Sequence, residues 1–331
     1  MTSLKNYINK IINFSLIEKL FKILRKNYLI LYYHGIIDDE EFKRLKGPNK
    51  HLFIPKSNFR DQIYFLKENN IDVISLDELY EKNFKPKKFS VVFTFDDGYK
   101  DNLEIAYPIL KENNFPFTIY IVPKILIETP WVWWLELWSQ LENRDIVFFK
   151  NEKINIDTEI KKTHFFLRIK KKIKLLKVED QKILIKEIFN LQKITDMSKY
   201  FLNISEIKHI LKDKLVTIGS HSNDHLSLKN FQKKEVFDQI SDSKNYLEKT
   251  FNINIRHFSY PYGQIQDISF NEHEILKDLK FSTSVTTLDY SYKNFNNYYL
   301  ERCSIGPNVK KDDFKRKLLG VDRILRKIFY R

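Results

Sequence analysis

Cysteine, glycine and proline are scarce in this 331-residue sequence. Cys303 is the only cysteine, so the chain cannot form an intramolecular disulfide, and a zinc site would have to use histidine and carboxylate ligands. The 7 glycines and 9 prolines are too few for a long flexible tether between domains. No apolar run reaches the roughly 18 residues of a transmembrane helix, and the N-terminal segment lacks a signal-peptide pattern. We therefore expect a cytoplasmic protein.

The charge of the chain is strongly positive. Lys and Arg number 57 and Asp and Glu number 43, which gives a net charge of +14. This charge permits attraction to phosphates, nucleic acid or anionic lipid. We expect no nucleic acid partner, because the aromatic residues are not interleaved with the basic runs. Residues 1–27 and 311–331 predict basic amphipathic helices, and each either docks on the domain or makes peripheral contact with an anionic membrane on its inner face.

Short apolar segments alternate with helical segments between these two ends. The predicted strands are 29–33, 73–75, 90–95, 118–122, 216–220, 257–260 and 282–286. The predicted helices are 57–69, 101–113, 205–213, 233–250 and 270–278. This alternation favours an α/β domain over residues 28–310, with a largely parallel sheet in a complete or incomplete barrel. Residues about 130–205 break the pattern and predict a helical insertion, with the run "RIKKKIKLLK" on a solvated helix face.

Two carboxylates stand where a buried strand should end. In the segment "SVVFTFDDGYKDN" (90–102), an apolar strand runs directly into Asp96 and Asp97. A later strand leads into "HSNDH", where His221 and His225 are four residues apart, a spacing that places both imidazoles on one side of a helical turn. Because the carboxyl ends of parallel strands share one end of the sheet, we expect these side chains to converge.

Asp97, His221 and His225 would together form a site for a divalent cation, with positions left open for water. The cation would neutralise one carboxylate and lower the pKa of its water to roughly 7, and Asp96 would act as the general base on that water. Two imidazoles and a carboxylate suit zinc, and they also suit cobalt, nickel or manganese. The alternative interpretation is that the Asp-Asp-Gly segment is only a helix cap and turn.

A third motif, "FSYPYG" (258–263), follows another predicted strand, and its turn can direct a backbone N–H outward as an oxyanion donor. Taken in order with "TFDDGY" (94–99) and "HSNDH" (221–225), it resembles the first three motifs of the polysaccharide deacetylase family, carbohydrate esterase family 4. The resemblance covers roughly residues 28–305. It implies a distorted or partial (β/α) barrel and metal-dependent hydrolysis of an N- or O-acyl group, usually the N-acetyl group of a sugar.

The resemblance also implies roles for individual residues. Asp96 would be the catalytic base, Asp97, His221 and His225 would bind the metal, and the backbone amide of Tyr262 would help to hold the oxyanion. The family's late leucine-x-histidine motif, which supplies the general acid, is missing. His34, in "LILYYHGI" (29–36), instead resembles the acid histidine near the start of poly-N-acetylglucosamine deacetylases, and the alternative is a core or turn histidine.

A second departure concerns the arginine that orients the base. The family pattern has this arginine four residues before the proline, where this sequence has His257, with Arg256 one residue earlier. A shift of one residue on a strand turns a side chain to the other face. We therefore expect Arg302, in "YYLERCSI", to be the partner of Asp96.

These features predict a carbohydrate N-deacetylase, a metal-dependent hydrolase that removes an N-acetyl group from an amino sugar in a surface polysaccharide or its biosynthetic precursor. Two alternatives are a deformylase or amidase acting on a lipid- or nucleotide-linked sugar, and a non-catalytic glycan-binding protein. A pure binding protein should have lost the base or a metal ligand, and all four residues are present. The four tryptophans of "WVWWLELW" (131–138) either stack on sugar or pack the insertion onto the barrel.

Overall fold

Parallel strands form the centre of the molecule. The computed structural model describes residues 15–127, 129–269, 271–289 and 296–329. The strands of the main sheet are β1 (Tyr28–Tyr33), β4 (Asp72–Val73), β5 (Ser90–Phe95), β6 (Phe117–Ile121), β9 (Val216–Ser220), β10 (His257–Ser259), β11 (Thr283–Val285) and β12 (Cys303–Ser304). Their order across the sheet is β11-β10-β9-β6-β5-β1-β12, and β4 pairs with the start of β5. Every pairing between these strands is parallel, as the alternation of strands and helices predicted.

The sheet curls far enough for its two edges to meet one segment of the chain. Cys303 pairs with Leu31 of β1, and Leu300 forms a parallel bridge with Val285 of β11. The backbone N–H of Arg302 also donates to the carbonyl of Leu288, 2.9 Å away. The segment 300–304 therefore joins both edges of the sheet, which confirms the distorted or partial (β/α) barrel.

Helices surround this sheet because its strands are apolar on both faces. All six residues of β5 and all five of β6 are buried, which is typical of a parallel sheet covered on both sides. The covering helices are α4 (Lys56–Glu68), α5 (Leu76–Glu81), α6 (Tyr107–Glu112), α10 (Ile204–Ile210), α11 (Lys233–Phe251) and α12 (Glu272–Asp278). The helix expected over 101–113 differs at its start, where residues 102–106 form a π-helical turn before α6.

Smaller elements complete the rim of the barrel. The two-stranded sheet β2 (Gly35–Ile37) and β3 (Phe53–Pro55) flanks helix α3 (Asp39–Arg44). Short helical turns are η1 (Pro48–Leu52), η3 (Pro123–Leu126), η4 (Ser198–Tyr200) and η5 (Leu228–Asn230). Of these, η1 follows directly on the loop after α3 and lies against helix α7 (Trp133–Glu142) of the insertion, with Asn49 donating to the carbonyl of Trp134.

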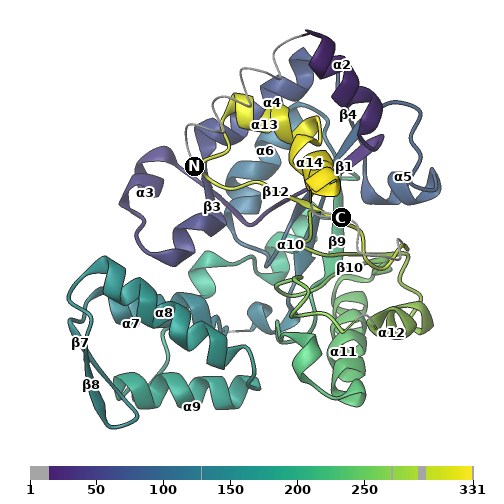
Figure 1. The fold of residues 1–331 in the computed structure, drawn as a ribbon. Helices are drawn as coiled ribbons and strands as arrows, with labels where there is room; N and C mark the ends of the chain where they lie inside the picture. The colour runs from purple at the N-terminus through teal and green to yellow at the C-terminus, as the bar shows by residue number, and fades with distance from the viewer. Residues whose placement is uncertain (1–14, 128, 270, 290–295, 330–331) are drawn as a thin grey trace.

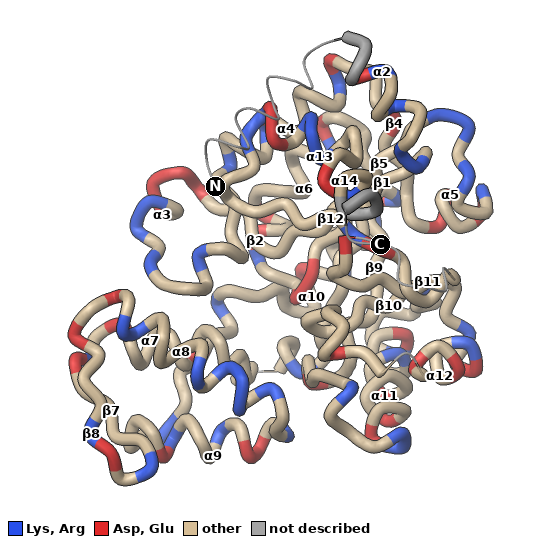
Figure 2. The backbone as a smooth tube through the Cα atoms, in the orientation of Figure 1, with Lys and Arg blue, Asp and Glu red and all other residues tan. Residues whose placement is uncertain are grey.

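The insertion forms a lobe beside the barrel with a core of its own (Figure 1). It consists of α7, the hairpin β7 (Ile146–Phe149) and β8 (Glu152–Asn155), and helices α8 (Glu159–Ile173) and α9 (Val178–Phe189). Trp133, Phe166 and Ile185 are buried between these elements. Acidic and basic residues are interspersed along the tube, and a basic run closes α8 on the side nearest the barrel (Figure 2).

The terminal helices dock on the domain in the part of the chain that the structure describes. Helix α2 (Ser15–Leu24) packs Phe21 against Leu319 and Val321, beside α13 (Lys311–Leu318) and α14 (Val321–Phe329). Glu18 of α2 also pairs with Lys315, at 2.8 Å. These contacts favour docking, and nothing among the described residues supports membrane contact. None of the described helices is both long and apolar enough to span a bilayer. The remainder of the predicted N-terminal helix, residues 1–14, lies outside the described residues.

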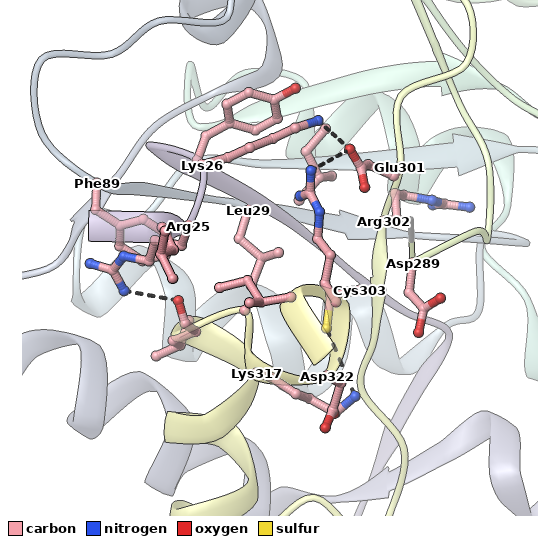
Figure 3. A pocket seen from close by; sticks show the side chains of 17 residues that line it. Arg25, Lys26, Leu29, Phe89, Asp289, Glu301, Arg302, Cys303, Lys317 and Asp322 are labelled. Atoms are coloured by element: carbon pink, nitrogen blue, oxygen red, sulfur yellow. Dashed lines mark hydrogen bonds and ion pairs between the residues drawn. The ribbon is translucent and has the colours of Figure 1, made fainter. Parts of the chain in front are cut away.

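Docking of the terminal helices holds the strand that carries Arg302. A cavity of about 140 Å³ lies between β1, β12 and these helices. Figure 3 shows the residues that line it, with the Arg302 side chain directed away from it. At its edge, the buried carboxylate of Glu301 pairs with Lys26 and, at 2.9 Å, with Arg323. Arg25 donates to the carbonyl of Leu318 at 2.8 Å. Both ends of the chain therefore position the segment 300–304.

We expect Glu301→Gln to lower the free energy of unfolding by about 2 kcal/mol, because it removes the charge that compensates two partly buried cations. Urea denaturation followed by circular dichroism measures this change. Lys43→Gln is the matched control, since its pair with Glu40 is exposed and should contribute about 0–1 kcal/mol. Equal losses for the two variants would contradict a structural role for the buried pair.

Candidate metal and acyl-transfer site

Polar side chains gather where the strands of the barrel end. Asp96 and Asp97 follow β5, His221 follows β9, and His34 follows β1. With His225 they line one cavity of about 540 Å³ at the carboxyl edge of the sheet. This edge is where parallel (β/α) folds assemble their sites, because loops there are free to vary around a fixed sheet.

Asp97, His221 and His225 form a compact group of metal-type ligands. One ligand atom from each residue lies within 4.8 Å of the other two. Oδ1 of Asp97 is 3.4 Å from Nε2 of each histidine, and this buried oxygen has no hydrogen-bond partner among the described residues. Nδ1 of His221 is 2.7 Å from the carbonyl of Ser259, so the ring donates there and directs the Nε2 lone pair at Asp97. Two lone pairs facing one buried carboxylate oxygen fit a divalent cation between them.

The close contacts between these three residues shift their pKa values. Burial acts to raise the pKa of Asp97, but contacts with His221 and His225 outweigh it and hold that pKa well below the usual range. Burial likewise opposes ionisation of His221, yet the nearby carboxylate of Asp97 raises the pKa of this histidine. Burial lowers the pKa of His225, which keeps its ring neutral and able to bind a metal.

The backbone of the site contains several residues in the left-handed region. Asp97, Ser222 and His225 have φ angles of 72°, 59° and 55°. The expected helical turn over 221–225 is therefore wrong: the segment is an irregular turn, closed by the N–H of His225 donating to Oγ of Ser222 at 3.1 Å. This turn, and not the helical spacing, brings the second imidazole back to Asp97. Gly98 also has a positive φ of 73°, and a Cβ there would lie 2.8 Å from Ile121.

Asp96 is held by a buried arginine from the closing segment of the barrel. Arg302 donates through Nη1 and Nη2 to the two carboxylate oxygens, at 2.8 and 2.7 Å. Arg302 also donates to the Thr286 carbonyl and to Oγ of Ser259, so its orientation is fixed. Burial acts to raise the pKa of Asp96, and Arg302 outweighs it, so the pKa is lowered and the carboxylate stays ionised at neutral pH.

Arg256 and His257 lie at the amino end of β10, away from this pair. The Arg256 guanidinium is 2.7 Å from Asp77, and His257 contacts the same carboxylate at 3.1 Å and Thr283 at 2.8 Å. Neither residue reaches Asp96 in the structure. Arg302 therefore occupies the position beside the candidate base, although it is 206 residues away along the chain.

Two further predicted residues face the same cavity. Burial lowers the pKa of His34, against the influence of Asp97 and Asp96, and its imidazole lines the site. Tyr262, with φ of 60°, donates no backbone hydrogen bond within the described chain, which leaves its N–H available to a ligand. Its ring centroid lies 4.7 Å from that of His225.

The insertion supplies the wall of the cavity opposite the barrel. The sequence left two roles open for its tryptophans, stacking on sugar and packing the insertion onto the barrel. Trp133 donates to the Tyr262 hydroxyl at 2.8 Å, and the Trp134 ring is 4.9 Å from the His225 ring. Both tryptophans are buried and line the cavity, so they pack the insertion onto the site and also border it. Lys170 and Lys174 of the basic run line this cavity too, which corrects the expectation that the whole run is a solvated face.

We expect the purified protein to bind one divalent cation per chain, and Asp97→Asn or His221→Ala to weaken that binding by more than about 100-fold. Loss of a residue that only hydrogen-bonds to a metal ligand lowers metal affinity by up to about 100-fold, and removal of a ligand itself should lower it at least as much. Metal content after dialysis, read by plasma mass spectrometry, measures it. His209→Ala, an exposed histidine on α10, is the matched control and should retain wild-type metal content. Equal metal in all four proteins would exclude this ligand set.

A curled parallel sheet with carboxylates and imidazoles at its carboxyl edge is typical of (β/α) barrels that carry a metal site. The family profile described as polysaccharide deacetylase matches residues 83–283. The chain belongs to the polysaccharide deacetylase family, the hydrolases of carbohydrate esterase family 4.

Individual relatives extend this comparison. The Bacillus subtilis (strain 168) protein YxkH is 32% identical over 98 residues, 29% of this chain and 32% of that protein. The Staphylococcus aureus (strain N315) protein named poly-beta-1,6-N-acetyl-D-glucosamine N-deacetylase is 22% identical over 271 residues, covering 81% of this chain and 72% of that protein. The structure of the Streptococcus pyogenes deacetylase PplD in complex with acetate aligns with a TM-score of 0.57 and 19% identity, over 88% of this chain and 97% of that one, which shows the shared fold.

Proposed function

We propose that this protein is a metal-dependent carbohydrate N-deacetylase, which removes an N-acetyl group from an amino sugar in a surface polysaccharide or its biosynthetic precursor. The observation that carries the proposal is the convergence of Asp97, His221 and His225 beside the pair of Asp96 and Arg302. The Staphylococcus aureus relative, a poly-beta-1,6-N-acetyl-D-glucosamine N-deacetylase, supports the substrate class.

Each residue of the site has a role in this proposal. Asp97, His221 and His225 would hold a divalent cation. Zinc is the first cation to test, because two imidazoles and a carboxylate suit it. Such a cation, when bound, polarises an acyl oxygen and lowers the pKa of water to about 7. Asp96 takes the proton from the attacking water, and the bidentate contact with Arg302 keeps the carboxylate ionised and directed into the cavity.

Two groups act on the charge that develops in the acyl group. The backbone N–H of Tyr262 is directed by a turn with positive φ and donates to the oxyanion. His34 donates a proton to the departing nitrogen, so that acetate and a free amino sugar result. Burial lowers the pKa of His34 and favours its neutral form, whereas Asp97 and Asp96 favour the protonated form that donation to the nitrogen requires.

The test is acetate release from N-acetylated oligosaccharides and nucleotide sugars, before and after metal removal with a chelator. Zinc, cobalt, nickel and manganese are then added back one at a time. Metal-dependent acetate release supports the proposal. Formate release from N-formyl analogues without acetate release would instead favour a deformylase, and tight sugar binding with no released acid would favour a glycan-binding protein.

A further inference from the structure

The basic run of α8 places two lysines on the wall of the site cavity. Lys170 and Lys174 are one helical turn apart and share this cavity with Asp97 and His225. Lys171, the next residue along α8, is exposed and does not line the cavity. The two lysines therefore differ from Lys171, which faces solvent.

Lys174 is fixed in place by a buried carboxylate and by an aromatic ring. Its ammonium lies 2.5 Å from Oδ1 of Asp267 and 4.2 Å from the centroid of the Tyr262 ring. Asp267 is buried and accepts a second hydrogen bond from Ser227 at 2.7 Å. Because the Tyr262 ring in turn contacts His225, only one side chain separates Lys174 from the candidate metal ligands.

Lys170 has no such partner. No carboxylate oxygen of the described residues lies within ion-pair distance of its ammonium, although the side chain is partly buried. Burial lowers the pKa of Lys170, repulsion by Lys174 lowers it further, and Asp267 offsets only part of this. His51, which also lines the cavity, is close enough for the positive charge of Lys170 to lower its pKa, although burial is the larger cause. A partly buried cation without a counter-ion is unfavourable, and an incoming anion would compensate it.

We propose that Lys170, supported by Lys174, binds a negatively charged group of the substrate, a phosphate or a carboxylate carried by the acylated sugar or its neighbour. The inference rests on the proposed function, because it places this anion in the cavity where the N-acyl group reacts. Lys174 is neutralised by Asp267, so its role is to position the wall, and Lys170 supplies the uncompensated charge. A site for a wholly neutral sugar polymer would gain nothing from that charge. The enzyme therefore selects anionic substrates, such as sugars linked through phosphate.

The experiment compares acetate release from matched N-acetylated oligosaccharides that are neutral, phosphorylated or carboxylated, using the metal-loaded protein. We expect wild type to prefer one anionic series. Lys170→Met should lower kcat/KM for that series by roughly 10- to 100-fold, the range for loss of a charge-assisted contact, and should lower it by a clearly smaller factor for the neutral series. Lys170→Arg should retain most of the preference. Lys171→Met, which removes an exposed charge one residue away, is the matched control and should behave as wild type.

The outcomes separate this inference from the proposed function. Equal rates on neutral and anionic substrates, unaffected by Lys170→Met, would overturn the inference and leave the deacetylase intact; Lys170 would then only cover the apolar wall of the cavity. If no substrate releases acetate, the proposed function fails, and calorimetric binding of glucosamine 6-phosphate against glucosamine still decides the inference. Tighter binding of the phosphorylated sugar that Lys170→Met abolishes would support the anion site, and equal binding of the two sugars would exclude it.

Discussion

Asp96→Asn is expected to lower turnover by orders of magnitude and to leave the metal site able to bind its cation. The amide cannot accept the proton of the attacking water, and loss of a general base typically lowers kcat by about 10²- to 10⁴-fold. Asp96 is not among the three clustered ligand atoms, so metal content should stay close to that of wild type. Acetate release and metal content, measured on the same preparation, test both halves of this expectation.

The control for Asp96→Asn is Asp77→Asn. Asp77 is also partly buried and paired with an arginine, Arg256, but it lies at the opposite end of the barrel. This variant should keep full activity, because its pair is about one third exposed and lies away from the site. A wild-type rate for Asp96→Asn would remove Asp96 from the chemistry. Loss of metal together with activity would instead make Asp96 a ligand.

The sequence predicted the sheet well because its strands carry their own signal. Each central strand is a short apolar run bounded by polar residues, and β5 and β9 match the predicted limits of 90–95 and 216–220. Asp96-Asp97 and His221 each follow a predicted strand. Because parallel strands share their direction, the sequence predicted that these side chains converge at one edge of the sheet. The reason given for His225 was wrong, since left-handed residues at positions 222 and 225 replace the helical turn.

Long-range contacts explain what the sequence could not place. The lysines of "RIKKKIKLLK" look alike along the chain, and only the packing of the insertion against the barrel separates Lys170 and Lys174 from Lys171. Ser259 was overlooked as well, although its carbonyl orients His221 and its hydroxyl contacts Asp96 at 3.3 Å. Its position two residues before the proline of "FSYPYG" was the available signal.

Arg302→Met is expected to destabilise the protein by about 3–5 kcal/mol, because it leaves the buried carboxylate of Asp96 without its cation. The pair is fully enclosed, with the Arg302 side chain 0% and Asp96 3% exposed. Urea denaturation of the metal-free protein at pH 7 measures the change. Arg256→Met is the matched control: its pair with Asp77 is about one third exposed, so its loss should be clearly smaller.

The pH dependence of this loss identifies the carboxylate that causes it. In wild type the pKa of Asp96 is lowered, so the pair stabilises the fold above the unfolded pKa, about 3.9, and this contribution is lost as pH falls through the lowered value. Without Arg302, only His221 and His34 oppose the effect of burial, so the pKa of Asp96 should rise, and protonation at lower pH relieves the unpaired charge. The deficit of Arg302→Met should therefore be largest at pH 7 and shrink towards pH 4. Adding Asp96→Asn to the Arg302→Met protein should lower the free energy of unfolding less than the same substitution does in wild type. A deficit that does not change with pH would mean that Arg302 stabilises the barrel through its contacts with Thr286 and Ser259, and not through Asp96.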